Sequence, residues 1–244
     1  MDPPADEWRR DLDALGARHG LVASQHRQLE KVLDVLARDE SAPTAVRSPG
    51  EALTVHLADS LVALELDVVQ AAGSLADMGT GAGFPGVPLA IALPQASVSL
   101  LESQERRCRF LMNVLAQASV ENARVVHARA EEWPDGTGRQ ELVLARALAD
   151  QAVVLEYAAP LLGLGGTLVD WRGRRAPERE RAAGAAAAEL GMQLVAIVKV
   201  DPFAGSRDHH LHVFEKVAET PARFPRRAGV ARKRPLGGGP PAGN

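Results

Sequence analysis

Hydrophobic residues along the chain follow two different periods. Over residues 6–72, leucines and valines recur every three or four positions, which predicts helices. Residues 41–49 interrupt this pattern, and a further helix is predicted over about 49–71 with Ser48 as its cap. Over residues 74–216, short apolar runs alternate with helical segments. The chain therefore combines a helical start with a region of strand–helix alternation.

Strand–helix alternation predicts a parallel sheet that is covered by helices on both faces. The predicted fold class is α/β with a mostly parallel seven-stranded sheet. The last two apolar runs have no clear helix between them, so one strand is expected to be antiparallel. The predicted strands are 75–78, 98–101, 124–127, 142–145, 167–171, 194–200 and 210–214, and the helices between them are about 85–93, 105–118, 150–162 and 177–190. The predicted domains are a helical extension (1–72), a core (73–217) and a basic, partly disordered tail (218–244).

Composition narrows the class of protein only slightly. The net charge is -3, so any nucleic-acid partner would need a local basic surface. A single cysteine, Cys108, excludes an internal disulfide framework and a multi-cysteine zinc site, and no metal is expected. The N-terminal residues have no apolar signal core, and no apolar run reaches the roughly 18 residues that a membrane helix needs. A cytoplasmic protein is expected.

A glycine-rich loop follows the first predicted strand. Gly79, Gly81 and Gly83 tolerate positive φ and let the backbone approach a ligand closely. Pro85 suits the first turn of the next helix, whose free N–H groups would face the loop. Gly81, Gly83 and Gly86 also match G-x-G-x-x-G, which alone is weak evidence for a dinucleotide. The pattern predicts a ligand site.

Acidic residues follow at the strand ends around this loop. Asp77 would repel a pyrophosphate and would suit the ammonium and hydroxyls of an amino-acid-bearing nucleoside. Glu102 ends the next strand, where it can accept hydrogen bonds from ribose, as in both NAD sites and methyltransferases. After the third strand, Ala130 and Glu131 are expected to face an adenine. Alternatively, Asp77 caps the helix, Glu102 is a surface residue and Glu131 begins a solvated helix.

Several ordered segments resemble one family. DMGTGAGFPGVPLAIALP, LLESQERRCRFL and VVHARAEEW closely resemble the RsmG family, also called GidB. VHLADSL, LARAL and PRRAGVARKRPL resemble its His-x-x-Asp-Ser-Leu segment, its Ser-Arg-Ala stretch and its basic C-terminal motif. The resemblance implies a class I, Rossmann-like methyltransferase fold, S-adenosylmethionine as cofactor, and methylation of guanine N7 in 16S rRNA, with 16S rRNA or an immature small ribosomal subunit as partner. It implies a cofactor site of Asp77, Gly79, Gly81, Gly83, Phe84, Glu102, Ala130, Glu131 and Arg146.

Two segments depart from the family pattern. Before the His-x-x-Asp-Ser helix, the family has an aromatic residue and Asn-Leu-Thr, whereas residues 39–44 keep only Thr44. After the fifth strand, the family's Leu-Lys-Gly is replaced by Trp171, Arg172 and Gly173. A guanidinium fork is not equivalent to an ammonium. These departures concern the placement of RNA more than the cofactor.

Methylation at guanine N7 requires no catalytic acid or base, because N7 carries an in-plane lone pair and no proton. The required contribution is alignment of the reacting atoms. N7 and O6 form an acceptor pair that suits an arginine fork, so Arg146 and Arg172 are the candidates for positioning the substrate. Alternatively, Arg146 pairs with a carboxylate such as Asp150.

Basic residues in the tail are candidates for binding RNA phosphates without reading sequence: Arg223, Arg226, Arg227, Arg232, Lys233 and Arg234. Alternatively, this end is simply solvated. Removing the chain from Pro221 onward is expected to weaken RNA binding and to leave cofactor affinity intact. The functions left open are a methyltransferase for another RNA or a small molecule, an NAD-dependent oxidoreductase, and a non-catalytic RNA-binding protein.

Overall fold

The computed structural model describes residues 7–237. Two long helices open the chain, α1 (Glu7–Arg18) and α2 (Ala23–Arg38). The helix predicted over 49–71 is a series of short turns rather than one regular helix. Within it, the Thr54 and Ser60 hydroxyls bond to carbonyls four residues earlier, which competes with regular helix geometry. The series consists of α3 (Pro49–Ala52), the π-turn η1 (Leu53–Ala58), α4 (Asp59–Leu61), the 3-10 turn η2 (Val62–Glu65) and α5 (Asp67–Gln70).

The sheet confirms the predicted fold class. Its seven strands lie in the order β3-β2-β1-β4-β5-β7-β6. β7 is antiparallel to both of its neighbours, and the other pairings are parallel. All seven predicted strands are present, as β1 (Ser74–Met78), β2 (Ser97–Glu102), β3 (Ala123–His127), β4 (Gln140–Arg146), β5 (Leu162–Arg172), β6 (Met192–Lys199) and β7 (His210–Lys216).

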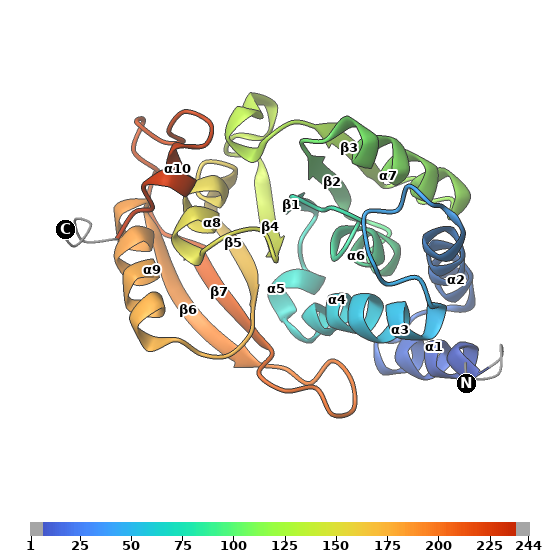
Figure 1. Cartoon of the computed structure of the whole chain (residues 1–244). Helices are drawn as coiled ribbons and strands as arrows, with labels where there is room; N and C mark the ends of the chain where they lie inside the picture. The colour runs from blue at the N-terminus through green and yellow to red at the C-terminus, as the bar shows by residue number, and fades with distance from the viewer. Residues whose placement is uncertain (1–6, 238–244) are drawn as a thin grey trace.

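Helices cover both faces of the sheet (Figure 1). On one face, α6 (Gly86–Ala92) and α7 (Glu105–Gln117) share a single core with the N-terminal helices. On the other face lie α8 (Gln151–Ala158), α9 (Pro177–Glu189) and the short α10 (Val230–Lys233). The N-terminal extension is thus part of a continuous core, because its leucines belong to the same buried cluster as the apolar residues of α6 and α7.

The carboxyl ends of β1, β2, β4 and β5 meet the start of the antiparallel β7 at one edge of the sheet. Residues far apart in sequence therefore converge at this edge, which is where ligands bind in open α/β sheets. Across residues 7–237, no helix is long and apolar enough to cross a membrane. The same residues contain no group of three or more His, Cys, Asp or Glu side chains arranged to hold a metal ion.

Candidate functional site

The buried side chain of Asp77 holds the glycine loop in place by hydrogen bonds near both of its ends. Its side chain is only 1% exposed, and its Oδ2 accepts hydrogen bonds from the Thr80 hydroxyl at 2.6 Å and from the Gly86 N–H at 2.8 Å. Burial raises the pKa of Asp77 to about 6, although these two hydrogen bonds oppose the shift. Asp77 therefore caps the start of α6, which is the alternative that the sequence left open.

Two glycines leave room for this arrangement. Gly79 has a φ of +65°, and a Cβ there would lie 2.5 Å from Cδ1 of Leu148. A Cβ on Gly86 would lie 2.4 Å from Cδ2 of Leu100 and 2.7 Å from Oδ2 of Asp77. All three distances are shorter than real Cβ contacts. The loop can close over the strand ends only because these positions carry no side chain.

A cavity of about 390 Å³ opens beside the loop. Among the predicted cofactor residues, four line it: Gly79, Glu102, Ala130 and Glu131. The predicted residues Asp77, Gly81, Gly83, Phe84 and Arg146 are not among those that line it. Its other walls come from the start of α7, the loop after β4, α8 and the C-terminal segment. We call this cavity the nucleoside pocket, because its volume and its carboxylates suit a nucleoside.

Glu102 lies at the floor of the nucleoside pocket. It ends β2 and is 3% exposed. Its Oε1 accepts a hydrogen bond from the Gln104 N–H at 2.8 Å, and its Oε2 lies 3.6 Å from Nη1 of Arg107. A carboxylate has more acceptor sites than these contacts use, so it can also accept the hydroxyls of a ribose.

The far wall of the pocket is formed by the 3-10 turn η3 (Ala130–Glu132) and by Tyr157 of α8. Burial and the neighbouring Glu131 raise the pKa of Tyr157. Arg232 forms part of the same wall, and its charge opposes the rise in the pKa of Tyr157. Arg232 was predicted as an RNA-binding residue from the sequence, and nothing in its local sequence indicates a place in this wall.

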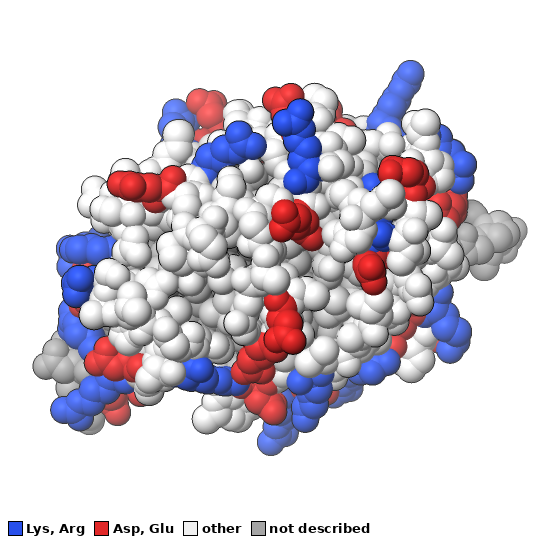
Figure 2. All heavy atoms as spheres, turned by 180° about the vertical axis from the view of Figure 1, so that it is seen from behind, with Lys and Arg blue, Asp and Glu red and all other residues white. Residues whose placement is uncertain are grey.

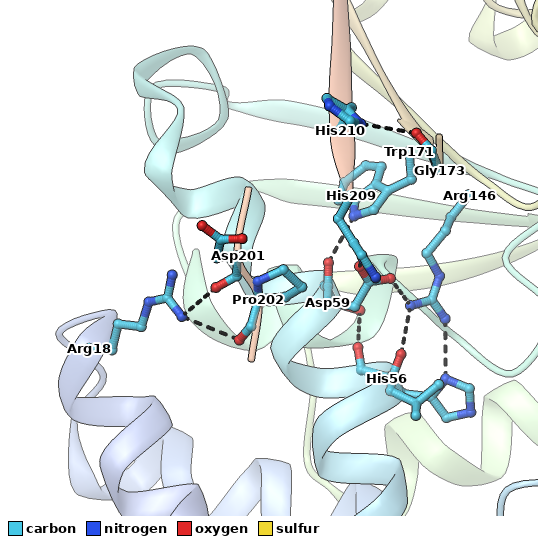
Figure 3. Close-up of polar contacts among 12 residues, drawn as sticks. Arg18, His56, Asp59, Arg146, Trp171, Gly173, Asp201, Pro202, His209 and His210 are labelled. Carbon is cyan, nitrogen blue, oxygen red and sulfur yellow. Dashed lines mark hydrogen bonds and ion pairs between the residues drawn. The ribbon is translucent and has the colours of Figure 1, made fainter. Parts of the chain in front are cut away.

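A second constellation lies at the end of β4 (Figure 3). Nη1 of Arg146 pairs with Oδ2 of Asp59 at 2.8 Å, and its Nη2 lies 3.3 Å from Nδ1 of His56. Arg146 thus pairs with Asp59 and not with Asp150, the partner considered from sequence. Nδ1 of His209 lies 3.2 Å from Oδ1 of the same carboxylate. We call these four residues the β4-end cluster.

His56, one of the two histidines in this cluster, is held neutral. Burial and the charge of Arg146 lower the pKa of His56 to about 4. Its Nε2 lies 3.1 Å from the Thr44 hydroxyl, which also accepts the Val46 N–H. Because Nδ1 faces a guanidinium donor, Nε2 is the nitrogen that carries the proton. Residues 39–44 depart from the family pattern, and Thr44 is the only one of them that matches it. Its contact with His56 gives a structural reason for that match.

Residues 171–173, the second segment that departs from the family pattern, contact the cluster and its neighbours. Trp171 donates from Nε1 to the Asp59 carbonyl at 2.8 Å, and His210 bonds to the Gly173 carbonyl at 2.9 Å. His209 was missed by the sequence analysis. The signal that could have found it is its position directly before the antiparallel strand, because such a strand starts where the parallel strands end.

Arg172 lies apart from both groups. It pairs with the buried Asp170 at 2.6 Å and lines a separate cavity between α8 and α9. Burial raises the pKa of Asp170 to about 6. His212, 3% exposed, lines the same cavity, and its Nε2 has no hydrogen-bond partner among residues 7–237. The structure therefore separates the two predicted positioning residues, Arg146 and Arg172.

The predicted RNA-binding residues differ in their surroundings. Arg226 forms an ion pair with Glu156, and Arg223 bonds to Glu189 at 3.1 Å. Exposed guanidinium or ammonium groups are found at Arg227, Arg232, Lys233 and Arg234. The face seen in Figure 2 is mostly uncharged, with Lys and Arg largely toward its rim and Asp and Glu both at the rim and near the middle. Most of the predicted disordered end, residues 238–244, lies outside the described residues.

Comparison with known proteins identifies close relatives. A family model described as rRNA small subunit methyltransferase G matches residues 25–208. The chain is 39% identical to a ribosomal RNA small subunit methyltransferase G from Pelotomaculum thermopropionicum, over 91% of this chain and 96% of that protein. It is 37% identical to the protein of the same name from Rubrobacter xylanophilus, over 96% and 92% of the two chains.

Solved structures show the same fold at lower identity. One is Aeropyrum pernix fibrillarin with natively bound S-adenosyl-L-methionine, with a TM-score of 0.51, 18% identity, and coverage of 64% of this chain and 72% of that chain. Another is a variant of the 16S rRNA (adenine(1408)-N(1))-methyltransferase from Catenulisporales acidiphilia, with a TM-score of 0.51, 19% identity, and coverage of 63% and 88%.

Proposed function

Because the chain belongs to the rRNA small subunit methyltransferase G family, we propose that its nucleoside pocket and β4-end cluster together methylate N7 of a guanine in 16S rRNA. S-adenosylmethionine is its cofactor. The observation that carries the proposal is the glycine loop, which connects the two sites. Gly79 lines the pocket, while the Phe84 ring stacks on His56 at 4.7 Å and lies 5.9 Å from the Arg146 guanidinium.

The nucleoside pocket fits the cofactor by its chemistry. Glu102 would accept the ribose hydroxyls, and the backbone of Ala130 together with Glu131 would face the adenine. The absent side chain at Gly79 leaves room for the part of the cofactor that leads toward β4. When bound, the cofactor supplies an activated methyl group on a positively charged sulfur. Asp77 contributes indirectly, by holding the loop in place.

The β4-end cluster would position the target base. Arg146 has five N–H donors, and its contacts with Val55, Asp59 and His56 hold it in place. Its remaining donors suit the O6 acceptor of a guanine edge, which leaves the lone pair of the adjacent N7 free to attack the methyl group. Asp59 is an orienting residue, because it fixes both Arg146 and His209. Arg172 lies outside this cluster, so any contact that it makes with the RNA would be through its separate cavity.

No residue needs to accept a proton in this reaction, since N7 has none to give. The chain's task is alignment, which can supply about 7–11 kcal/mol of the barrier reduction. The neutral state of His56 fits this role, because the methylated base becomes cationic and a charged imidazole beside it would oppose the product. Asp59 supplies the negative charge nearby.

An accessible guanine is also required, so we assign the substrate as a single-stranded region of 16S rRNA, in free RNA or in an immature small subunit. The exposed Arg227, Lys233 and Arg234 would bind its phosphates. Phosphate contacts of this kind set orientation and not sequence preference.

The decisive experiment maps N7-methylguanosine in 16S rRNA from cells with and without the protein. We expect one guanine to lose its methyl group in the deletion strain and to regain it with the wild-type gene. Complementation with Glu102→Gln should fail or be slow, because loss of the charge weakens ribose binding by roughly tenfold. Glu105→Gln, which alters an exposed acid at the start of α7, is the matched control. An unchanged methylation map in the deletion strain would refute the proposal.

A further inference from the structure

The C-terminal segment is packed against the catalytic core and does not extend away from it. We call residues 224–234 the strap. Phe224 is 8% exposed and Ala231 is 2% exposed, and both belong to the core cluster that contains α8. Figure 1 shows α10 lying beside α8, on the side of the molecule opposite the N-terminal helices. The strap therefore has a fixed place relative to the pocket wall that α8 forms.

An ion pair anchors the strap at its first half. Glu156 of α8 is 1% exposed, and its Oε1 accepts a hydrogen bond from Nε of Arg226 at 2.7 Å. Nη2 of Arg226 bonds to Oε2 of the same carboxylate and to the Arg234 carbonyl. One guanidinium thus ties α8 to both ends of the strap. Such a bidentate contact with a buried carboxylate fixes orientation as well as distance.

The second half of the strap contacts the nucleoside pocket. The Gly229 N–H donates to Oε1 of Glu131 at 3.2 Å, and Nη2 of Arg232 donates to the Leu148 carbonyl at 3.1 Å. The charge of Arg232 also acts on Tyr157 and opposes the rise in its pKa. Leu148, Tyr157 and Glu131 all line the pocket, as Arg232 itself does. Arg232 thereby bridges the loop after β4 and the wall expected to face the adenine.

We propose that the strap is a wall of the cofactor site, with Arg232 as a cofactor-positioning residue, and that RNA bound to the strap's outer face tightens cofactor binding. The proposal rests on the proposed function, because it takes the nucleoside pocket as the cofactor site. Arg232 closes the pocket by holding Leu148 and Tyr157 in register, so its loss opens the adenosine end to water.

RNA binding and cofactor binding can be coupled because the residues for both lie close together along the strap. Arg227, Lys233 and Arg234 are exposed on the same strap, and Lys233 directly follows Arg232. An RNA phosphate held by these groups further restrains the strap against the pocket. A wall that is already restrained costs less entropy for the cofactor to order, and the effect is reciprocal between the two ligands.

The test measures binding of S-adenosylhomocysteine by calorimetry, because this product-state ligand allows no turnover. In the absence of RNA, Arg232→Ala should raise its Kd about tenfold over that of the full-length wild-type protein. Arg181→Ala removes the same side chain from an exposed position on α9 that does not line the pocket, and should leave this Kd unchanged. Equal melting temperatures of the unliganded variants exclude misfolding as the cause.

The coupling is measured by repeating the titrations with a 16S rRNA fragment present. RNA should lower the Kd of S-adenosylhomocysteine severalfold for the wild type, and Arg232→Ala should abolish this effect. An Arg232→Ala variant that binds S-adenosylhomocysteine as the wild type does would overturn the positioning role. A wild-type Kd that RNA does not change would overturn the coupling. If the wild type binds no S-adenosylhomocysteine at all, the proposed function fails instead, so the two failures are distinguishable.

Discussion

Asp77 and Glu102 end adjacent strands, yet their surroundings give them different tasks. Asp77 is buried from solvent, and its Oδ2 accepts hydrogen bonds from the Thr80 hydroxyl and the Gly86 N–H. Glu102 lines the nucleoside pocket and bonds chiefly to the backbone of the following turn. At the scale of the residue, one carboxylate therefore builds the loop, and the other is available to a ligand.

Substitutions at Asp77 separate these two tasks. Asp77→Ala should lower the free energy of unfolding by about 1–3 kcal/mol, because it leaves the buried Gly86 N–H and Thr80 hydroxyl unpaired. Asp77→Asn retains an acceptor oxygen and should keep cofactor affinity, which calorimetry measures. A large loss of affinity in Asp77→Asn would instead indicate direct contact with the cofactor.

The raised pKa of Asp77 adds a dependence on pH. Between the unfolded value of 3.8 and the folded value of about 6, the folded state binds more protons, so wild-type stability falls as pH rises through this window. Asp77→Asn does not titrate. In denaturant unfolding, the free energy of unfolding of Asp77→Asn should therefore rise relative to that of the wild type between pH 4 and pH 7, by on the order of 2 kcal/mol.

At the scale of elements, the start of α6 fixes how closely the glycine loop approaches the sheet. Gly86 begins α6 and lies against both β1 and β2, through Asp77 and Leu100. By contrast, Gly184 lies within α9, where an added Cβ would meet nothing within 4 Å. The two helix glycines thus differ in packing and in position, because Gly86 is the tightly packed first residue of α6 and Gly184 lies in the open interior of α9.

Replacing each glycine by alanine should change stability in opposite directions. Gly86→Ala overpacks the loop and should lower the free energy of unfolding by about 1–3 kcal/mol, with a matching loss of cofactor affinity. Gly184→Ala should raise it by roughly 0.5–1 kcal/mol, because alanine favours a helix interior. Denaturant unfolding of both variants checks the signs; a stabilised Gly86→Ala would contradict the packing around α6.

At the scale of the whole molecule, the chain's two ends are integrated with opposite faces of the sheet. The N-terminal helices share the core of α6 and α7, and the strap shares the core of α8. The expectation that removal of residues 221–244 leaves cofactor affinity intact is therefore replaced by its opposite. Such a truncation takes Arg232 from the pocket and Arg226 from the buried Glu156.

The Arg226–Glu156 pair offers a direct measure of this integration. Arg226→Ala leaves a buried carboxylate without its partner and should lower the free energy of unfolding by about 3–5 kcal/mol. Adding Glu156→Gln removes the unpaired charge and should restore part of the loss. Thermal unfolding of the single and double variants makes the comparison, and equal stabilities of the two would show that the buried charge is not the cause.

The amino-acid sequence by itself determined the seven strands, the antiparallel return and the place of the nucleoside pocket. These features depend on local patterns: apolar runs of fixed period, and glycines next to carboxylates at predicted strand ends. Gly79, Glu102, Ala130 and Glu131 lie in such patterns, so their convergence follows once the strands are parallel.

Only the tertiary structure decided which distant groups pair. Asp59 and Arg146 are 87 residues apart, Gly229 and Glu131 are 98 apart, and His209 and Asp59 are 150 apart. No local period encodes such contacts, because side-chain charges are satisfied by whichever partner the packed helices and strands bring near. The same packing places Arg232 of the basic tail in a wall of the nucleoside pocket.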